Sequence, residues 1–189
     1  MNPFPIILNI RDKKFLVIGG GKVATEKIKR LLSFTKNITI LSPDLTSELN
    51  EIVDKEHLTY ISQKYTPELI SDYDIIIIAV NDIELQKEIY QDAKKSKKLC
   101  NTVDVVEYSD FIFPSIVKKG DLIVSFSTSG SSPAIAKYLR QIFERIIPDE
   151  IEDFLKEMKE LREKIPKGKE RQEILDKKAR EFIEKYFNL

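Results

Sequence analysis

Three small residues near the N-terminus, Gly19, Gly21 and Ala24, have the G-x-G-x-x-A spacing of a dinucleotide-binding turn. Apolar residues 15–18 precede them, in a run of the length expected for a buried strand, and a helical pattern follows. In such a turn the first glycine permits a tight bend, and the second lets the backbone approach a pyrophosphate. The pyrophosphate would bind N–H groups at the positive end of the helix. The pattern therefore predicts a dinucleotide site, and the alternative is a tight turn without a ligand.

A second candidate is Asp104, the last residue of the stretch Cys100-Asn-Thr-Val-Asp104. Ligands of parallel α/β sheets bind beyond the carboxyl ends of the strands, so we expect Gly19–Gly21, Asn81 and Asp104 to line one crevice. There the carboxylate of Asp104 is suited to general-base chemistry beside a nicotinamide, and its valine neighbours would lower the local polarity and strengthen the base. The alternative is an aspartate that only caps a turn. Asn81, with Asp82, either caps the next helix or contacts the cofactor.

The choice of dinucleotide depends on the residues about 20 positions beyond the glycines, where an acid binds the ribose of NAD. Ser42 falls nearest to that place, and Asp44 is the nearest acid. No arginine follows the predicted second strand to accept a 2′-phosphate. These residues favour NAD over NADP.

A third feature is a hydroxyl-rich stretch, residues 127–133, ahead of a helical pattern. Donors at the positive end of a helix suit an anion such as a carboxylate. The alternative is a serine-rich capping loop with Pro133 at the helix start. The candidate anion-binding residues are Ser127, Thr128, Ser129, Gly130, Ser131 and Ser132.

The elements that must position these residues alternate between strands and helices as far as residue 125 or so. Apolar runs predict strands at 15–18, 37–41, 58–61, 74–80, 98–103 and 122–126. Helical patterns begin at Gly21, cover 46–53, 81–95 and 134–147, and include a brief helix with Thr66 as its cap and Pro67 in its first turn. The alternation predicts an α/β fold with a Rossmann-like, doubly wound parallel sheet. Two charged amphipathic segments, 149–164 and 169–187, predict a small helical C-terminal region.

Composition narrows the class of protein. The 189 residues have a formal net charge of zero, so no global field attracts nucleic acid or an anionic membrane. A single cysteine excludes an intrachain disulfide and cysteine-rich zinc sites, and the only histidine, His57, is expected at the surface, so we predict no resident metal. No apolar run approaches the roughly 18 residues of a membrane span, and no signal peptide is recognisable. We therefore expect a cytoplasmic protein.

Taken in order, the motifs of this chain resemble those of the precorrin-2 dehydrogenase / sirohydrochlorin ferrochelatase family, which includes the N-terminal module of siroheme synthase. The similarity covers roughly residues 3–148. The segments that carry it are Pro5–Asp12, Val17–Ala24, Cys100–Asp104, Phe111–Ser115, and Ser127–Pro133 with Leu139-Arg140.

The resemblance implies NAD⁺-dependent oxidation of precorrin-2 to sirohydrochlorin, followed in some members by insertion of Fe²⁺. It implies a homodimer, with a Rossmann domain at 1–112, a dimerisation segment at 113–147 and a helical domain at 148–189. The family's key aspartate, proposed for proton removal or metal handling, falls at Asp104, and a serine that can be phosphorylated falls at Thr128. The family's dinucleotide contacts fall at Gly19, Gly20, Gly21, Lys22, Val23, Pro43 and Asp44. Metal insertion stays open, and the alternative function is a dinucleotide-sensing regulatory module without chemistry.

Overall fold

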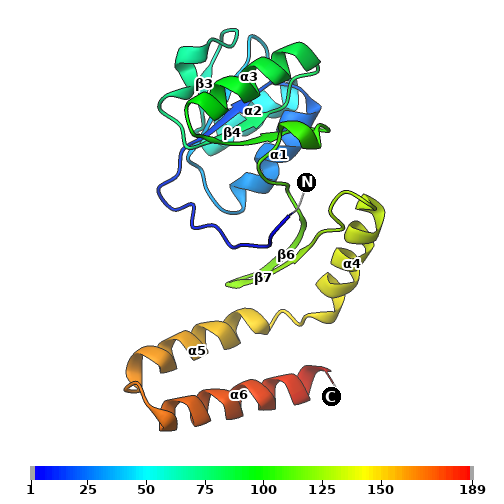
Figure 1. The fold of residues 1–189 in the computed structure, drawn as a ribbon. Helices are drawn as coiled ribbons and strands as arrows, with labels where there is room; N and C mark the ends of the chain where they lie inside the picture. Colours follow the sequence, from blue (N-terminus) through cyan, green and yellow to red (C-terminus); the bar gives the residue numbers. More distant parts are fainter. Residues whose placement is uncertain (1–2, 188–189) are drawn as a thin grey trace. The chain divides into compact units, whose positions relative to one another are not determined.

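The computed structural model describes residues 3–187, and the chain forms two compact units, one ending at Ile112 and the other beginning at Phe113 (Figure 1). The first unit holds the glycine turn and Asp104, and the second holds the hydroxyl-rich stretch. Within the described residues, no helix is both long and apolar enough to cross a bilayer.

A five-stranded parallel sheet forms the centre of the first unit, with the strand order β3-β2-β1-β4-β5. Its strands are β1 (Phe15–Ile18), β2 (Ile38–Leu41), β3 (Thr59–Ile61), β4 (Ile75–Ile78) and β5 (Leu99–Thr102). β1 pairs with β2 on one side and with β4 on the other, so the strand order reverses between β1 and β4. A ligand crevice lies at such a reversal in open α/β sheets. The predicted doubly wound sheet is confirmed.

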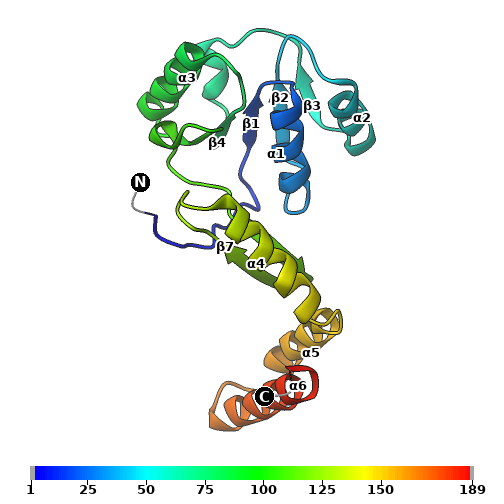
Figure 2. The same ribbon diagram turned by 90° about the vertical axis from the view of Figure 1, so that its right-hand side faces the viewer.

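Helices cover both faces of this sheet, as Figure 2 shows. One face carries α1 (Lys22–Leu32) and α2 (Ser47–Glu56), and the other carries the short 3₁₀ helix η1 (Pro67–Ile70) and α3 (Ile83–Lys95). Because both faces are covered, β4 can consist of four isoleucines, all at most 2% exposed. The helix predicted after Thr66 is a 3₁₀ turn, and the Thr66 side chain makes no capping hydrogen bond.

The second unit corrects one prediction. The strand at 122–126 is not part of the parallel sheet, because β7 (Leu122–Phe126) pairs antiparallel with β6 (Ser115–Lys119) in a two-stranded sheet of its own. β6 was not predicted from the sequence. Alternate residues of β7 are exposed, among them Ile123 and Ser125, as in a strand covered on one face only. The parallel sheet therefore ends at Thr102.

Three helices follow the hairpin: α4 (Pro133–Ile146), α5 (Ile151–Lys164) and α6 (Lys169–Phe187). Val117 of β6, Ile147, Ile151 of α5 and Phe182 of α6 form one buried cluster. Phe182 stacks on Phe154 with ring centroids 4.3 Å apart. The hairpin and the C-terminal helices thus share a core, and the division at residue 147 stays a prediction.

Candidate dinucleotide site and its surroundings

The turn between β1 and α1 requires glycine at its first two positions. Gly19 has φ +127°, and a Cβ there would lie 2.3 Å from the carbonyl oxygen of Ala79, just after β4. A Cβ on Gly20 would lie 1.9 Å from the carbonyl oxygen of Asp44, just after β2. The backbone N–H of Thr46 also donates to the carbonyl of Gly20 at 2.9 Å. Both glycines therefore let the turn pack against the ends of the two neighbouring strands.

Gly21 is different, because a Cβ built there would meet no atom within 4 Å. This residue caps α1 without a side-chain hydrogen bond, and the first turn of α1 contains no acid. By contrast, the N-terminus of α2 is capped by the Thr46 hydroxyl and that of α3 by the Asp82 carboxylate. The positive end of α1 thus has neither a side-chain cap nor an acid in its first turn, and the space beside Gly21 is open. That arrangement fits the pyrophosphate of a dinucleotide.

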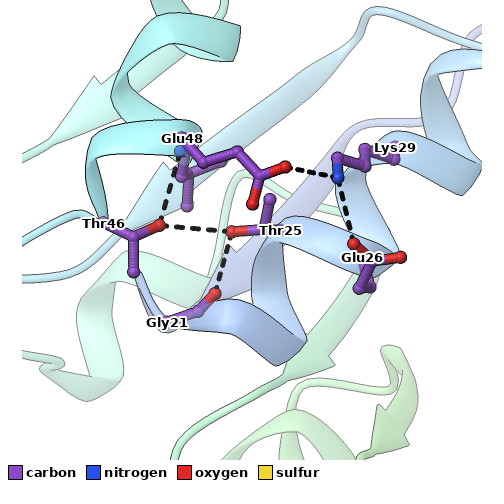
Figure 3. A network of polar contacts seen from close by, with 7 residues as sticks. Gly21, Thr25, Glu26, Lys29, Thr46 and Glu48 are labelled. Atoms are coloured by element: carbon purple, nitrogen blue, oxygen red, sulfur yellow. Dashed lines mark hydrogen bonds and ion pairs between the residues drawn. The ribbon is translucent and has the colours of Figure 1, made fainter.

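A chain of polar contacts fixes the shape of this turn (Figure 3). The Thr25 hydroxyl donates to the carbonyl of Gly21 at 3.0 Å and lies 3.4 Å from the Thr46 hydroxyl. Since the Thr25 proton is already donated, Thr46 is the donor between the two hydroxyls. Beside them, the Lys29 ammonium bridges Glu26 at 3.0 Å and Glu48 at 2.6 Å. These contacts tie α1 to the start of α2 and hold Gly21 in place.

Pro43 and Asp44 lie at the carboxyl end of β2, and both are exposed. The Tyr60 hydroxyl donates to the carbonyls of Ser42 and Pro43 at 3.1 and 3.2 Å, and the Ser62 hydroxyl also reaches the Pro43 carbonyl. The backbone before Asp44 is therefore fixed while its carboxylate stays accessible. This is the place where an acid binds the ribose of NAD in such folds.

Asn81 and Asp82, just after β4, have different roles. Asp82 alone caps α3, because its carboxylate accepts from the N–H groups of Glu84 and Leu85 at 3.0 and 3.2 Å. Asn81 is exposed beside it, at the strand end where the predicted crevice lies. Its contact with the cofactor stays a prediction.

Two buried amides near the strand ends were missed by the sequence analysis. Gln86 donates to the carbonyl of Val80 at 2.6 Å, and Asn101 donates to the carbonyl of Phe111 at 2.8 Å. Their other amide atoms, Oε1 of Gln86 and Oδ1 of Asn101, are buried without a hydrogen-bond partner. An unpaired buried acceptor costs free energy, so both atoms are suited to receive a donor from a ligand or a water molecule. Neither residue has a local sequence signal.

Asp104 follows β5 in a tight turn, where it has the left-handed φ of +62° that aspartate tolerates better than most residues. The turn is held from both sides, because the Thr102 hydroxyl donates to the carbonyl of Tyr108 and the Ser109 hydroxyl donates to the carbonyls of Thr102 and Val105. Asp104 itself is exposed. Because the residue is exposed to solvent, the low-polarity surroundings expected from its valine neighbours are not seen, and its role as a base stays a prediction.

Lys27 is a third residue that was not singled out from the sequence. It lies half-buried on α1, and its pKa is lowered by burial and by the nearby charge of Arg30. The carboxylate of Asp104 acts on Lys27 in the opposite direction, which brings this lysine and the predicted catalytic aspartate into one electrostatic neighbourhood. The two residues lie 77 positions apart, so only the folded sheet connects them.

The hydroxyl-rich loop of the second unit uses much of its hydrogen-bonding capacity internally. The Ser132 hydroxyl accepts from the N–H of Ile135 at the start of α4, and the Thr128 hydroxyl accepts from the N–H of Ser132 at 2.9 Å. The Ser127 hydroxyl accepts from the N–H of Ser129 at 3.1 Å. These bonds are those of a capping loop, with Pro133 in the first turn as expected. Anion binding by residues 127–132 stays a prediction.

Comparison with known proteins identifies the family. The model of the family described as "Putative NAD(P)-binding" matches residues 6–115, more than half of the chain. The chain belongs to this NAD(P)-binding family. The matched region includes both the glycine turn and Asp104, so the family assignment and the geometry at the β1–β4 reversal agree on a dinucleotide site.

The chain is 36% identical to the siroheme synthase of Baumannia cicadellinicola over 148 residues. These residues make up 78% of this chain and 32% of that protein. The siroheme synthase of Neisseria meningitidis is 33% identical over 153 residues, or 81% of this chain and 32% of its own. The chain thus spans about a third of the length of these relatives. Among solved structures, "SirC, precorrin-2 dehydrogenase" matches 99% of this chain and 100% of its own, with a TM-score of 0.79 and 22% identity, which shows a shared fold.

Proposed function

We propose that this chain is an NAD⁺-dependent dehydrogenase that oxidises precorrin-2 to sirohydrochlorin. The observation that carries the proposal is the glycine turn, whose open α1 N-terminus lies beside the β1–β4 reversal, in a chain with siroheme synthase relatives. The fold shared along its whole length with a precorrin-2 dehydrogenase supports the same activity.

The oxidation removes a hydride and a proton from the macrocycle. NAD⁺, when bound, supplies the hydride acceptor. The N–H groups of Lys22 and Val23 at the start of α1 would hold its pyrophosphate, and Asp44 would bind its ribose. The Asp104 carboxylate accepts the proton, because it lies exposed just after β5 in a turn that Thr102 and Ser109 hold in place.

The substrate is a polycarboxylate, and we propose that the hydroxyl-rich loop binds part of it. Ser129 and Ser131 are exposed in this loop, and Gly130 has φ +90° with open space where a Cβ would lie. The hydroxyl groups of Ser129 and Ser131 suit a carboxylate, whereas their N–H groups already donate to the Ser127 hydroxyl and to the Thr128 carbonyl.

We also propose a homodimer, with a second copy covering α4. Six large apolar side chains of this helix are between 37% and 60% exposed: Ile135, Tyr138, Leu139, Ile142, Phe143 and Ile146. Their three- and four-residue spacing forms one continuous stripe along the helix. Such a stripe is self-complementary across a two-fold axis, and an apolar patch of this kind marks a protein interface.

Anaerobic absorbance spectroscopy tests the proposed activity directly. Precorrin-2 is mixed with the purified chain, with and without NAD⁺, and Fe²⁺ is added after the first reaction has ended. Conversion to sirohydrochlorin only with NAD⁺ supports the dehydrogenase, and a metal-dependent change faster than the protein-free control adds Fe²⁺ as a second substrate. Tight NAD⁺ binding without conversion would instead favour a dinucleotide-sensing module.

A further inference from the structure

Two hydroxyl groups at the edge of the parallel sheet hold the β2–α2 loop, residues 42–46. The Tyr60 hydroxyl on the edge strand β3 donates to the carbonyls of Ser42 and Pro43 at 3.1 and 3.2 Å. The Ser62 hydroxyl, just after β3, also donates to the Pro43 carbonyl at 3.2 Å. The Pro43 carbonyl therefore receives hydrogen bonds from both hydroxyl groups, and the start of the loop is tied to β3.

The other side of this loop packs on the glycine turn. The backbone N–H of Thr46 donates to the carbonyl of Gly20 at 2.9 Å. The carbonyl oxygen of Asp44 lies so near Gly20 that a Cβ built there would approach it to 1.9 Å. The backbone around Asp44 is thus held from two sides, by β3 and by the turn that would receive the pyrophosphate, while Asp44 itself is exposed.

A carboxylate fixed at this place discriminates between the two dinucleotides. It accepts a hydrogen bond from the ribose 2′-hydroxyl of NAD⁺, whereas NADP⁺ carries at that position a phosphate, which a carboxylate repels. A carboxylate on a loose loop discriminates less well, because ordering the loop costs binding free energy and the acid can turn away from the phosphate. Discrimination therefore depends on the groups that hold the loop as well as on the acid.

We propose that Tyr60 and Ser62 are positioning residues that make this chain selective for NAD⁺ over NADP⁺. They act through the backbone of Pro43 and not on the dinucleotide itself. The inference rests on the dinucleotide site of the proposed function, but not on its macrocyclic substrate. Tyr60 has the larger role, because its hydroxyl reaches two carbonyls and the residue is half-buried, whereas Ser62 is exposed.

The test compares two affinities, measured by isothermal titration with NAD⁺ and with NADP⁺. In Tyr60→Phe, which removes only the hydroxyl, we expect the Kd of NAD⁺ to rise about fivefold and the Kd of NADP⁺ to stay the same or fall. The ratio of the NADP⁺ Kd to the NAD⁺ Kd should therefore fall at least about fivefold. Ser62→Ala, at an exposed position, should lower this ratio about twofold.

Tyr65→Phe is the matched control. The Tyr65 hydroxyl also donates a hydrogen bond of 3.1 Å, to the carboxylate of Asp92 on α3, which covers the other face of the sheet. Both tyrosine variants should lower the Tm, because each loses a hydroxyl hydrogen bond, but only Tyr60→Phe should change the Kd ratio. In an Asp44→Ala background, Tyr60→Phe should leave the ratio unchanged, since Tyr60 acts through Asp44.

Each outcome supports or overturns the role of Tyr60. A Kd ratio that is the same in Tyr60→Phe and the wild type would overturn the inference, and so would a change in the ratio that persists without Asp44. An equal loss of affinity for both dinucleotides would show a merely structural role. A wild-type chain that binds NADP⁺ as tightly as NAD⁺ would also overturn the inference. Selective NAD⁺ binding without oxidation of precorrin-2 would overturn the proposed function alone.

Discussion

The two adjacent glycines of the β1–α1 turn offer a matched pair of substitutions, Gly20→Ala and Gly21→Ala. Each adds a single methyl group, yet the surroundings of that group are opposite. At Gly20 the new Cβ would lie 1.9 Å from the carbonyl oxygen of Asp44 and 2.8 Å from the Ser42 hydroxyl, whereas at Gly21 it would meet no atom within 4 Å. The first change should therefore damage the fold, and the second should damage only ligand binding.

The magnitudes follow from these distances. Ordinary contact begins near 3.4 Å, so the Asp44 backbone must move by about 1.5 Å to admit Gly20→Ala. Overpacking of this kind costs about 1–3 kcal/mol, which lowers the Tm of a unit of this size by about 5–15 °C. Gly21→Ala loses only a preference for glycine at the helix cap, at most about 1 kcal/mol. Its methyl group, however, occupies the space where the pyrophosphate approaches, and a similar overlap there weakens NAD⁺ binding about 5- to 150-fold.

Thermal unfolding followed by circular dichroism gives the stability of each variant, and isothermal titration with NAD⁺ gives the affinity. We expect Gly20→Ala to have a clearly lowered Tm, and Gly21→Ala to keep a Tm within about 5 °C of the wild type while losing NAD⁺ affinity. A folded Gly21→Ala chain with the wild-type Kd for NAD⁺ would refute the placement of the pyrophosphate over α1. An unchanged Tm in Gly20→Ala would refute the packing of the turn against Asp44.

Three further predictions concern other parts of the chain. Asp104→Asn should keep the wild-type Kd for NAD⁺ but lower kcat for precorrin-2 about 10²- to 10⁴-fold in stopped absorbance assays, and full turnover would remove its role as the base. Burial, with a smaller contribution from Asp110, raises the pKa of the Cys100 thiol to about 12, so the unfolded chain loses this proton first as the pH rises. The contribution of Cys100 to stability should thus fall progressively between about pH 9 and pH 12 in denaturant titrations, and a Cys100→Ala chain with the same pH dependence would contradict this. Ile142→Asp should convert a dimer into a monomer in sedimentation equilibrium, whereas an unchanged mass would exclude the α4 interface.

The main elements of the first unit, and one helix cap in the second, were predictable because their signals are local. Phe15–Ile18 and Ile75–Ile78 are continuous apolar runs that only a strand covered on both faces can bury, and both occupy the centre of the sheet. The glycine spacing identified the turn because the backbone conformation of Gly19, with φ +127°, strongly favours glycine. Asp82 and Ser132 cap their helices through short-range hydrogen bonds. Each of these features depends on residues within a few positions of one another.

The wrong predictions arose where a local sequence pattern is compatible with two different tertiary arrangements. Leu122–Phe126 is short and apolar, and such a run suits a parallel sheet or a hairpin equally. In the structure this run pairs with Ser115–Lys119 and forms a hairpin, with Gly120 at φ +55° in the turn. The two-residue turn between the strands is the sequence signal that was overlooked. The polarity around Asp104 was likewise misjudged, since its exposure to solvent depends on the turn that Ser109 and Thr102 hold.

The sequence by itself thus determined the Rossmann-like sheet, the glycine turn and the caps of α3 and α4, since backbone sterics and hydrophobic periodicity act over short stretches of chain. Only the tertiary structure decided that Lys27 and Arg30 share an electrostatic neighbourhood with Asp104, and that Gln86 and Asn101 bury acceptors without partners. Charge interactions and desolvation depend on distance and burial in space, and a parallel sheet brings together strand ends that lie tens of residues apart in the chain.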